Sequence, residues 1–206
     1  MSYKNWTKYA LRFDSYYDNN RFYNILRKKG IEFRMRTVCD LIGDLKNMRI
    51  IDIGCGAGRL SIELAMSGAE VWGVDIAADA IKQANINAKN AGVESHVHFI
   101  QGDLYGDSIS LPPADVWVAL GFLEYLEEPS IVLRKVSHIP KYVFSIPIKM
   151  SWEIPLRVIN RRLLKGTRFY TYTKKTTTAM LNGAGYVDVN FIPYFRVGYM
   201  VHNYQS

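Results

Sequence analysis

Arg49-Ile-Ile-Asp-Ile-Gly-Cys-Gly-Ala-Gly-Arg59 is the stretch that decides the fold of this chain, because an apolar segment runs directly into a glycine-rich turn. Its isoleucines place apolar side chains on both faces of a strand, which is typical of a central parallel strand covered by helices on each side. Its three glycines allow a sharp turn and a close approach of a ligand to the backbone. The amphipathic run Arg59-Leu-Ser-Ile-Glu-Leu-Ala-Met66 follows and predicts a helix whose N-terminus offers free amide groups to the same ligand.

A carboxylate ends the next predicted strand, Val71-Trp-Gly-Val-Asp75. Asp75 follows Gly54 by 21 residues, and an acid at the tip of the second strand of such a unit is placed to accept hydrogen bonds from a ribose diol. The sequence therefore predicts a binding site for a nucleoside cofactor.

The glycine spacing separates two classes of nucleoside site. Dinucleotide sites use G-x-G-x-x-G, whereas this turn reads G-x-G-x-G and has Arg59 at the next position. Asp52-Ile-Gly-Cys-Gly-Ala-Gly58 resembles motif I of the class I S-adenosylmethionine-dependent methyltransferases. Further matches come in the expected order, with Gln101-Gly-Asp103-Leu104 after the third strand and Asp115-Val-Trp-Val-Ala-Leu-Gly121 as the fourth. The resemblance covers residues 49–146 well and the whole chain more loosely.

The resemblance implies S-adenosylmethionine (SAM) as cofactor and S-adenosylhomocysteine (SAH) as product. Arg34 stands 18 residues before Asp52, about where the quinone-biosynthesis O-methyltransferases place an arginine for the cofactor carboxylate; Arg36 is an equal candidate. Cys55 is expected to be a small filler of the turn, not a nucleophile. The residues that the resemblance assigns to the cofactor are Asp52, Gly54, Cys55, Gly56, Gly58, Asp75, Ile76, Asp103, Leu104, Leu120, Gly121 and Arg34.

Alternating strands and helices predict a doubly wound, Rossmann-like α/β sheet. The methyltransferase resemblance supplies the strand order 3-2-1-4-5-7-6 with strand seven antiparallel, and it adds an N-terminal helical cap. The last two strands are expected over Tyr186–Ile192 and Val197–Asn203, joined around Pro193. The other predicted elements are helices over 77–91, 129–136 and 173–182, and strands over 96–100, 115–120 and 141–146.

Composition favours one domain. At 206 residues and 49% hydrophobic, the chain can bury one substantial core. It divides into a cap over 1–48, a cofactor core over 49–146, a substrate-side insertion over 147–175, and a C-terminal helix end and β-hairpin over 176–206. No long apolar run or signal-peptide core stands out, and the two cysteines form no metal-ligand pattern, so a cytoplasmic protein without a metal is expected.

Positive charge is concentrated outside the cofactor core. Residues 49–146 carry 7 basic and 12 acidic side chains, whereas residues 1–48 carry 10 and 5, and residues 147–175 carry 8 and 1. In class I enzymes the two basic segments form the walls of the acceptor pocket, so these walls would attract a carboxylate or phosphate. Solvated faces that serve solubility explain the same charge equally well.

The segment after the fourth strand indicates the type of acceptor. It lacks the Asn/Asp-Pro-Pro-Tyr of amino-directed DNA methyltransferases. Instead, Gly121-Phe-Leu-Glu-Tyr-Leu-Glu-Glu-Pro129 resembles the L-E-H-x-x-x-P segment of small-molecule methyltransferases, with Tyr125 in the place of the histidine. Tyrosine, with a pKa near 10, is better suited to orienting an acceptor than to deprotonating it. Glu124 is a candidate base or metal-linked carboxylate, and a surface position is an equal alternative.

Two further segments supply candidates for the acceptor pocket. Tyr16-Tyr-Asp-Asn-Asn-Arg-Phe22 loosely resembles an element that closes over cofactor and substrate in magnesium-protoporphyrin methyltransferases, which makes Tyr16 a catalytic candidate and Tyr17 a substrate contact. The run 156–165 predicts a basic amphipathic helix that fits a lid over an amphiphilic anion, a membrane surface, or simple packing. The arginines expected to contact the anion are Arg157, Arg161 and Arg168.

Together these patterns predict methyl transfer from SAM to an oxygen or nitrogen of a small, anionic or amphiphilic molecule. An RNA or nucleotide methyltransferase is favoured by the pI of 9.3, but the acidic core and the lack of a recognisable RNA-binding module argue against nucleic acid. A cofactor-binding protein without turnover is the other alternative. Membrane contact is expected to be peripheral at most, and the oligomeric state is left open.

Overall fold

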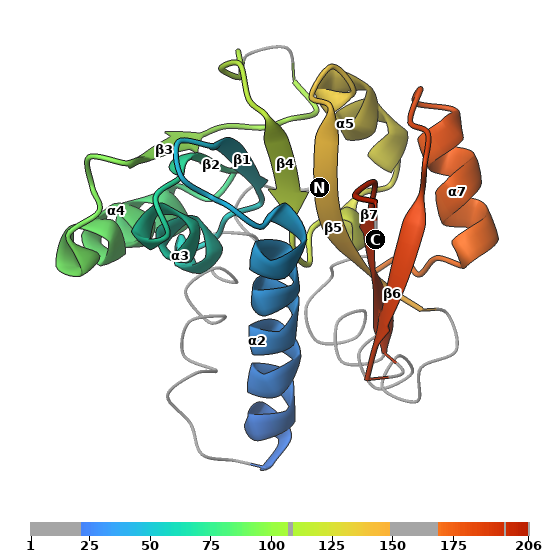
Figure 1. Ribbon diagram of the computed structural model, residues 1–206, viewed down its shortest axis with the longest axis horizontal. Coiled ribbons are helices and arrows are strands. Elements are labelled where there is room, and N and C mark those ends of the chain that lie inside the picture. The colour runs from blue at the N-terminus through green and yellow to red at the C-terminus, as the bar shows by residue number, and fades with distance from the viewer. Residues whose placement is uncertain (1–21, 107–108, 149–168, 196, 206) are drawn as a thin grey trace.

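The computed structural model describes residues 22–106, 109–148, 169–195 and 197–205 (Figure 1). Its strands are β1 (Arg49–Ile53), β2 (Glu70–Asp75), β3 (Val97–Gln101), β4 (Val116–Ala119), β5 (Lys141–Pro147), β6 (Asn190–Tyr194) and β7 (Gly198–His202). Its helices are α2 (Phe22–Ile42), α3 (Arg59–Met66), α4 (Ala78–Ala91), the short 3₁₀ helix η1 (Leu123–Tyr125), α5 (Pro129–Val136) and α7 (Lys174–Asn182).

The seven strands form one sheet in the order β3-β2-β1-β4-β5-β7-β6. The neighbours from β3 to β5 are parallel, and β7 is antiparallel to both β5 and β6. The predicted doubly wound fold, its strand order and its antiparallel strand seven are therefore confirmed.

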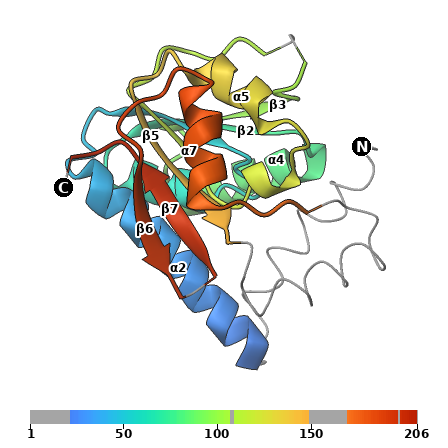
Figure 2. The ribbon, with the colours of Figure 1, turned by 90° about the vertical axis from the view of Figure 1, so that its right-hand side faces the viewer.

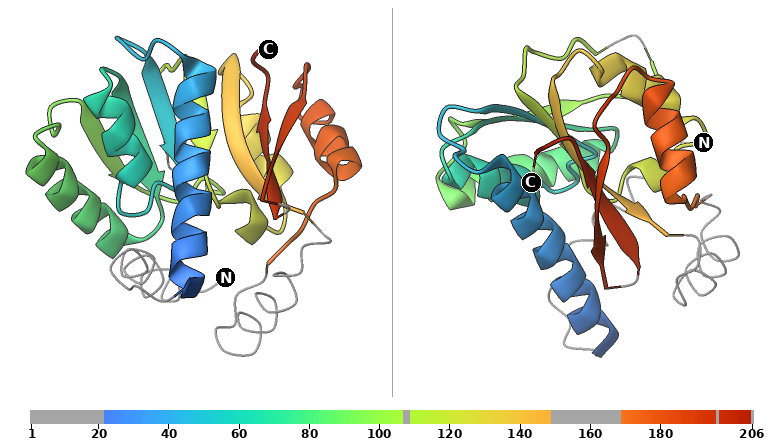
Figure 3. Two further views of the ribbon diagram at one scale, coloured as in Figure 1. Left: turned by 60° about the horizontal axis from the view of Figure 1, so that its bottom comes forward. Right: turned by 45° about the vertical axis from the view of Figure 1, so that its right-hand side comes forward.

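Alternation along the central strands divides the core into two layers. Val116 and Val118 on β4 pack with residues of α2, α3 and α4, whereas Trp117 between them packs with residues of α5 and α7. Successive side chains of a strand point to opposite faces, so a strand buried on both sides reads as a continuous apolar run. Helices α5 and α7 lie side by side (Figure 2), and α2 and α7 lie on opposite sides of the β6–β7 pair (Figure 3).

Helix α2 is the described part of the expected cap. Its C-terminal half packs on the sheet, where Val38 is fully buried, and its N-terminal half projects beyond the strand ends (Figure 1). In the ranges that the structure describes, no helix combines the length and the apolar character needed to cross a membrane.

The predicted boundaries of the last hairpin are wrong. Residues 186–189 lie outside the sheet, and β6 runs through Pro193 to Tyr194. Proline is tolerated because β6 is an edge strand, whose outward N–H groups need no partner. Tyr186 does not pair as a strand residue because it is buried between the face of the sheet and α5, where its hydroxyl donates to the carbonyl of Leu133 at 2.9 Å. The turn falls at Phe195, which has a φ of 45°.

Candidate functional site

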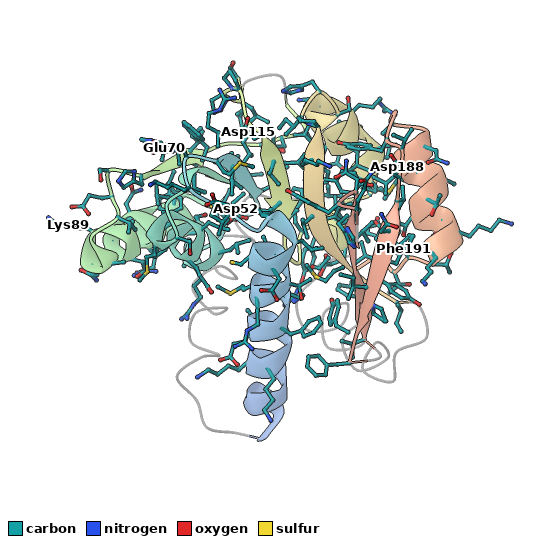
Figure 4. The ribbon with its side chains drawn as sticks, in the orientation of Figure 1. Asp52, Glu70, Lys89, Asp115, Asp188 and Phe191 are labelled. Atoms are coloured by element: carbon teal, nitrogen blue, oxygen red, sulfur yellow. The ribbon has the colours of Figure 1, made fainter. Side chains whose placement is uncertain are left out.

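The candidate site lies at the carboxyl ends of the parallel strands, where ligands bind in open α/β sheets. Figure 4 shows Glu70 and Asp115, which stand at the amino ends of β2 and β4, along the upper edge of the sheet. The glycine turn after β1 and the projecting half of α2 belong to the opposite edge (Figure 1). The fold therefore brings the N-terminus of α3, the ends of β2, β4 and β5, and α2 to one side of the molecule.

The three glycines of the turn all have positive φ, but they differ in what surrounds them. A Cβ atom at Gly54 would lie 2.6 Å from the ring of Phe122, and one at Gly58 would lie 2.6 Å from the ring of Phe99. These two glycines permit close packing within the protein. A Cβ at Gly56 would meet no atom of the described residues within 4 Å. The backbone at Gly56 therefore faces open space, which is the cradle that a closely approaching ligand requires.

Asp75 is fixed beside this cradle. Its Oδ2 accepts the backbone N–H of Gly56 at 2.9 Å, and its Oδ1 accepts that of Ala77 at 2.9 Å. Burial raises the pKa of the Asp75 carboxyl, while these backbone hydrogen bonds oppose the rise. The N–H of Ile76 also acts on this carboxyl; because a carboxylate has about four acceptor positions, the backbone orients it and leaves acceptor capacity for a ligand hydroxyl. This geometry is what recognition of a ribose diol needs.

Asp52 supports the turn from within the core. It is 2% exposed, and the hydroxyl of Ser61 on α3 donates to its Oδ2 at 2.7 Å. Burial raises the pKa of Asp52 to about 7, the negative charge of Asp75 adds to the rise, and the Ser61 bond opposes it. Figure 4 shows Asp52 near α3. Its position links β1 to α3.

The buried carboxyl predicts a pH-dependent stability. An unfolded aspartate titrates near pH 4, so between about pH 4 and 7 the folded protein binds its proton more tightly and stability falls as pH rises. Asp52→Asn keeps an oxygen for Ser61 and removes the charge. Between pH 5 and 8, we expect the free energy of unfolding of the wild type to fall by about 2 kcal/mol more than that of Asp52→Asn. Urea denaturation measures both values. Asp40→Asn, at an exposed position, is the control. If the free energy of unfolding of Asp52→Asn depends on pH as that of the wild type does, the raised pKa of Asp52 is contradicted.

Arg34 reaches the site from α2. Its Nη1 donates to the Ser145 hydroxyl on β5 at 3.3 Å, and Nη1 also lies 3.6 Å from the position that a Cβ of Gly121 would occupy. The Ser145 hydroxyl in turn accepts the N–H of Gly121 at 2.9 Å. The alternative candidate, Arg36, is exposed on α2. The structure therefore brings Arg34 to the end of β4, next to the predicted cofactor residue Gly121.

The loop after β3 closes another side of the site. Asp103 is exposed and its Oδ1 accepts the N–H of Tyr105 at 2.9 Å, whereas Leu104 is buried in the core. The Tyr105 hydroxyl accepts the N–H of Glu128 at 2.9 Å, which ties this loop to the start of α5. The side chain of Leu104 thus packs inward, and a ligand contact from this loop is left to Asp103 and the backbone.

The predicted acceptor residues after β4 form η1. Glu124 is 7% exposed, which excludes the surface position, and its Oε1 lies 3.6 Å from the Cβ position of Gly121. The ring of Tyr125 packs edge-on against Phe169 at 5.9 Å between centroids. The segment after the insertion docks on this turn, because the N–H of Tyr170 donates to the carbonyl of Glu124 at 2.8 Å.

The remaining predicted cofactor residues are distributed around the same edge. Ile76 and Leu120 are half-buried at the ends of β2 and β4. Cys55 lies under the turn against Gly73, and burial raises the pKa of its thiol, as suits a filler. The predicted residues that lie outside the described ranges are Tyr16, Tyr17, Arg157, Arg161 and Arg168. Across the described ranges, no group of three or more His, Cys, Asp and Glu side chains could hold a metal ion.

Sequence reasoning missed two serines of the site, Ser61 and Ser145. Each had a usable signal: a hydroxyl in the first turn of the helix after the glycine turn, and a lone polar residue inside the apolar strand Tyr142-Val-Phe-Ser-Ile146. A buried hydroxyl needs hydrogen-bond partners, so a serine in such a run marks a polar contact across the core.

Comparison with known proteins supports this geometry. Residues 44–165 match the sequence profile of a family described as Methyltransferase domain. The ubiquinone biosynthesis O-methyltransferase of Aeromonas salmonicida is 33% identical over 104 residues, which are 50% of this chain and 43% of that protein. The enzyme of the same name from Serratia proteamaculans is 29% identical over 109 residues, which are 52% of this chain and 44% of that protein. The chain thus spans less than half the length of these relatives.

Solved structures share the fold. Magnesium protoporphyrin IX methyltransferase from Synechocystis, with bound SAH, superposes with a TM-score of 0.75 at 21% identity and covers 95% of this chain and 93% of that chain. Human N-acetylserotonin methyltransferase, in complex with SAM, gives a TM-score of 0.65 at 20% identity, and the match covers 82% of this chain and 50% of that chain. At these identities the likeness shows a common architecture.

Proposed function

The chain belongs to the methyltransferase domain family, which it matches over residues 44–165, and from this premise we propose that it is a SAM-dependent methyltransferase that acts on a small molecule. The observation that carries the proposal is the open cradle at Gly56 beside an Asp75 carboxylate fixed by two backbone amides. Solved proteins of this fold bind SAM and SAH, and the two groups fit the nucleoside of that cofactor.

Each residue of the site is assigned to one part of the cofactor. Asp75 would accept the ribose hydroxyls, and Gly56 would let the cofactor lie against the backbone. The exposed Asp103 would face the base. Arg34, held at Gly121, would bind the carboxylate of the amino-acid moiety, since a guanidinium offers paired donors to a carboxylate. When bound, the cofactor supplies a methyl group on a sulfonium, which is a good leaving group.

Because the leaving group is good, the protein chiefly needs to orient the acceptor and exclude water. Tyr125 and the buried Glu124 are the described residues that we assign to positioning the acceptor, together with Tyr16 from outside the described ranges. A carboxylate acceptor arrives ionised and needs no general base. For a hydroxyl or amine acceptor, Glu124 is the candidate base, since it is buried next to Gly121.

The acceptor that we propose is small and anionic or amphiphilic, methylated on oxygen or nitrogen. Support comes from the basic excess on both segments that flank the cofactor core and from the exposed Lys28 and Lys29 on α2. Relatives in sequence and fold are named for ubiquinone biosynthesis and for magnesium protoporphyrin IX. The scarcity of cysteine favours a cytoplasmic setting.

The charge argument predicts a specific kinetic defect. Replacing Arg157, Arg161 and Arg168 together with Gln should raise the acceptor KM and leave SAM affinity unchanged, because lost uniform binding raises KM without lowering kcat. The expected rise is about fivefold to 100-fold, according to how many of the three pairs are bidentate. Steady-state kinetics at low salt measures it. Lys89→Gln, in the last turn of α4 at the outer side of the molecule (Figure 4), is the control for loss of a surface charge. Wild-type KM in the triple variant contradicts the anionic acceptor.

The function itself is tested with methyl-labelled SAM. The protein is incubated with labelled cofactor and a fractionated cell extract, and transfer is followed by mass spectrometry, with Asp75→Ala as the background reaction. We expect label in a metabolite fraction that depends on the wild-type protein. Label confined to RNA would support the nucleic-acid alternative instead, and SAM binding without transfer to any fraction would support a protein that binds the cofactor without turnover.

A further inference from the structure

A buried serine stands in the middle of the apolar strand β5 and links Arg34 to Gly121. Ser145 is 1% exposed, and its neighbours Phe144 and Ile146 are fully buried. Burial of a hydroxyl is unfavourable unless the hydroxyl is hydrogen-bonded. The partners of Ser145 therefore indicate why a polar residue stands in an apolar strand.

Those partners come from two distant parts of the sequence. The Ser145 hydroxyl oxygen accepts the N–H of Gly121, after β4, at 2.9 Å and the Nη1–H of Arg34, on α2, at 3.3 Å. A hydroxyl oxygen has two lone pairs and can accept both bonds at once. Ser145 thus joins three segments at the point where the cofactor carboxylate is assigned.

Arg34 is held by two other contacts besides Ser145. Its Nε donates to the carbonyl of Gly30 one turn earlier at 3.1 Å, and its guanidinium lies 5.8 Å from the centre of the Tyr194 ring. Within the described residues, the two hydrogen bonds of this side chain use two of its five N–H groups, so donors remain for an anion. A long side chain that is already fixed loses less conformational entropy when a ligand binds.

We propose that Ser145 is a positioning residue, which holds the Arg34 guanidinium beside Gly121 in readiness for the carboxylate of the amino-acid moiety of SAM. The inference rests on the proposed function and deepens it, since it assigns a role to a residue that does not itself face the ligand. Removal of the hydroxyl should weaken binding only of ligands that carry that carboxylate.

Two ligands separate this role from a structural one. SAH carries the amino-acid carboxylate, and 5′-methylthioadenosine shares its nucleoside but lacks the carboxylate. In calorimetric titrations, Ser145→Ala should weaken SAH binding about fivefold to tenfold, the value of one hydrogen bond, and change methylthioadenosine affinity less than twofold. An equal loss for both ligands, or no loss for SAH, overturns the proposal.

Matched variants exclude a general loss of packing. Val143→Ala removes buried volume from the same face of the same strand and should lower the melting temperature without changing the ratio of the two affinities. Ser145→Thr retains the hydroxyl and should restore SAH binding to within twofold of the wild type. Ser145→Cys keeps the volume but accepts hydrogen bonds weakly, and it replaces the alanine variant if that variant does not fold.

A double-mutant cycle shows whether Ser145 acts through Arg34. Arg34→Met should weaken SAH binding, and adding Ser145→Ala to it should cause less than a twofold further loss. A full fivefold loss in the Arg34→Met background overturns the proposal. If the wild-type protein does not bind SAH, the proposed function is contradicted. If the wild type binds SAH and Ser145→Ala binds it equally well, this inference alone is contradicted.

Discussion

Replacing Asp75 with alanine is expected to weaken SAH binding at least about 100-fold, because two charge-assisted hydrogen bonds to ribose hydroxyls are each worth about 1.5–3 kcal/mol. The structure adds a second reason. The carboxylate also accepts the N–H groups of Gly56 and Ala77, so the alanine variant loses the bonds that shape the cradle. Calorimetric titration of the folded variant measures the loss.

Two controls accompany this variant. Asp75→Asn keeps the size and one oxygen and should fall between wild type and alanine. Asp79→Ala removes an exposed carboxylate four residues later, in the first turn of α4, and should bind SAH as the wild type does. Unchanged SAH affinity in Asp75→Ala removes the basis for the ribose assignment.

Gly56→Val is expected to abolish detectable SAH binding and to leave the fold intact. Among the described residues, no atom lies within 4 Å of a Cβ at this position, so the valine side chain would project into the space assigned to the cofactor. The φ of 55° at Gly56 adds strain, for which we expect a stability loss of about 1–3 kcal/mol. Calorimetry and thermal denaturation measure the two effects separately.

Gly92→Val is the matched control for strain. Gly92 has a φ of 69°, a Cβ there also has no atom of the described ranges within 4 Å, and it ends α4 away from the cradle. It should lose comparable stability and keep wild-type SAH affinity. Valine at Gly54 or Gly58 should instead act through packing, since it would strike Phe122 or Phe99. A Gly56→Val protein that binds SAH normally would show that the cofactor does not approach this turn.

The central part of the fold could be predicted from the sequence because its signals are local. Ile50, Ile51 and Ile53 place apolar side chains on both faces, the glycines follow at once, and Asp75 ends the next strand. One short stretch therefore specifies a strand, a turn, a helix and an acid. The full strand order came from the family resemblance, because nothing local determines which edge of a sheet a distant strand joins.

The errors fall where tertiary context overrides a local rule. Pro193 was expected to end a strand, but an edge strand accommodates it. Tyr186 is a residue type that favours strands, but its hydroxyl donates to α5 and its ring packs against Trp117 on the face of the sheet. Ser145 was missed because its role depends on Arg34, which lies 111 residues away in the sequence. Contacts of that kind are visible only after the chain is folded.

A crystal structure of the protein grown with SAH tests the central claim most directly. The account predicts the ribose hydroxyls within hydrogen-bond distance of the Asp75 carboxylate, the ligand against the backbone at Gly56, and the amino-acid carboxylate on the Arg34 guanidinium. SAH bound elsewhere, or bound at this edge with its ribose away from Asp75, would contradict it.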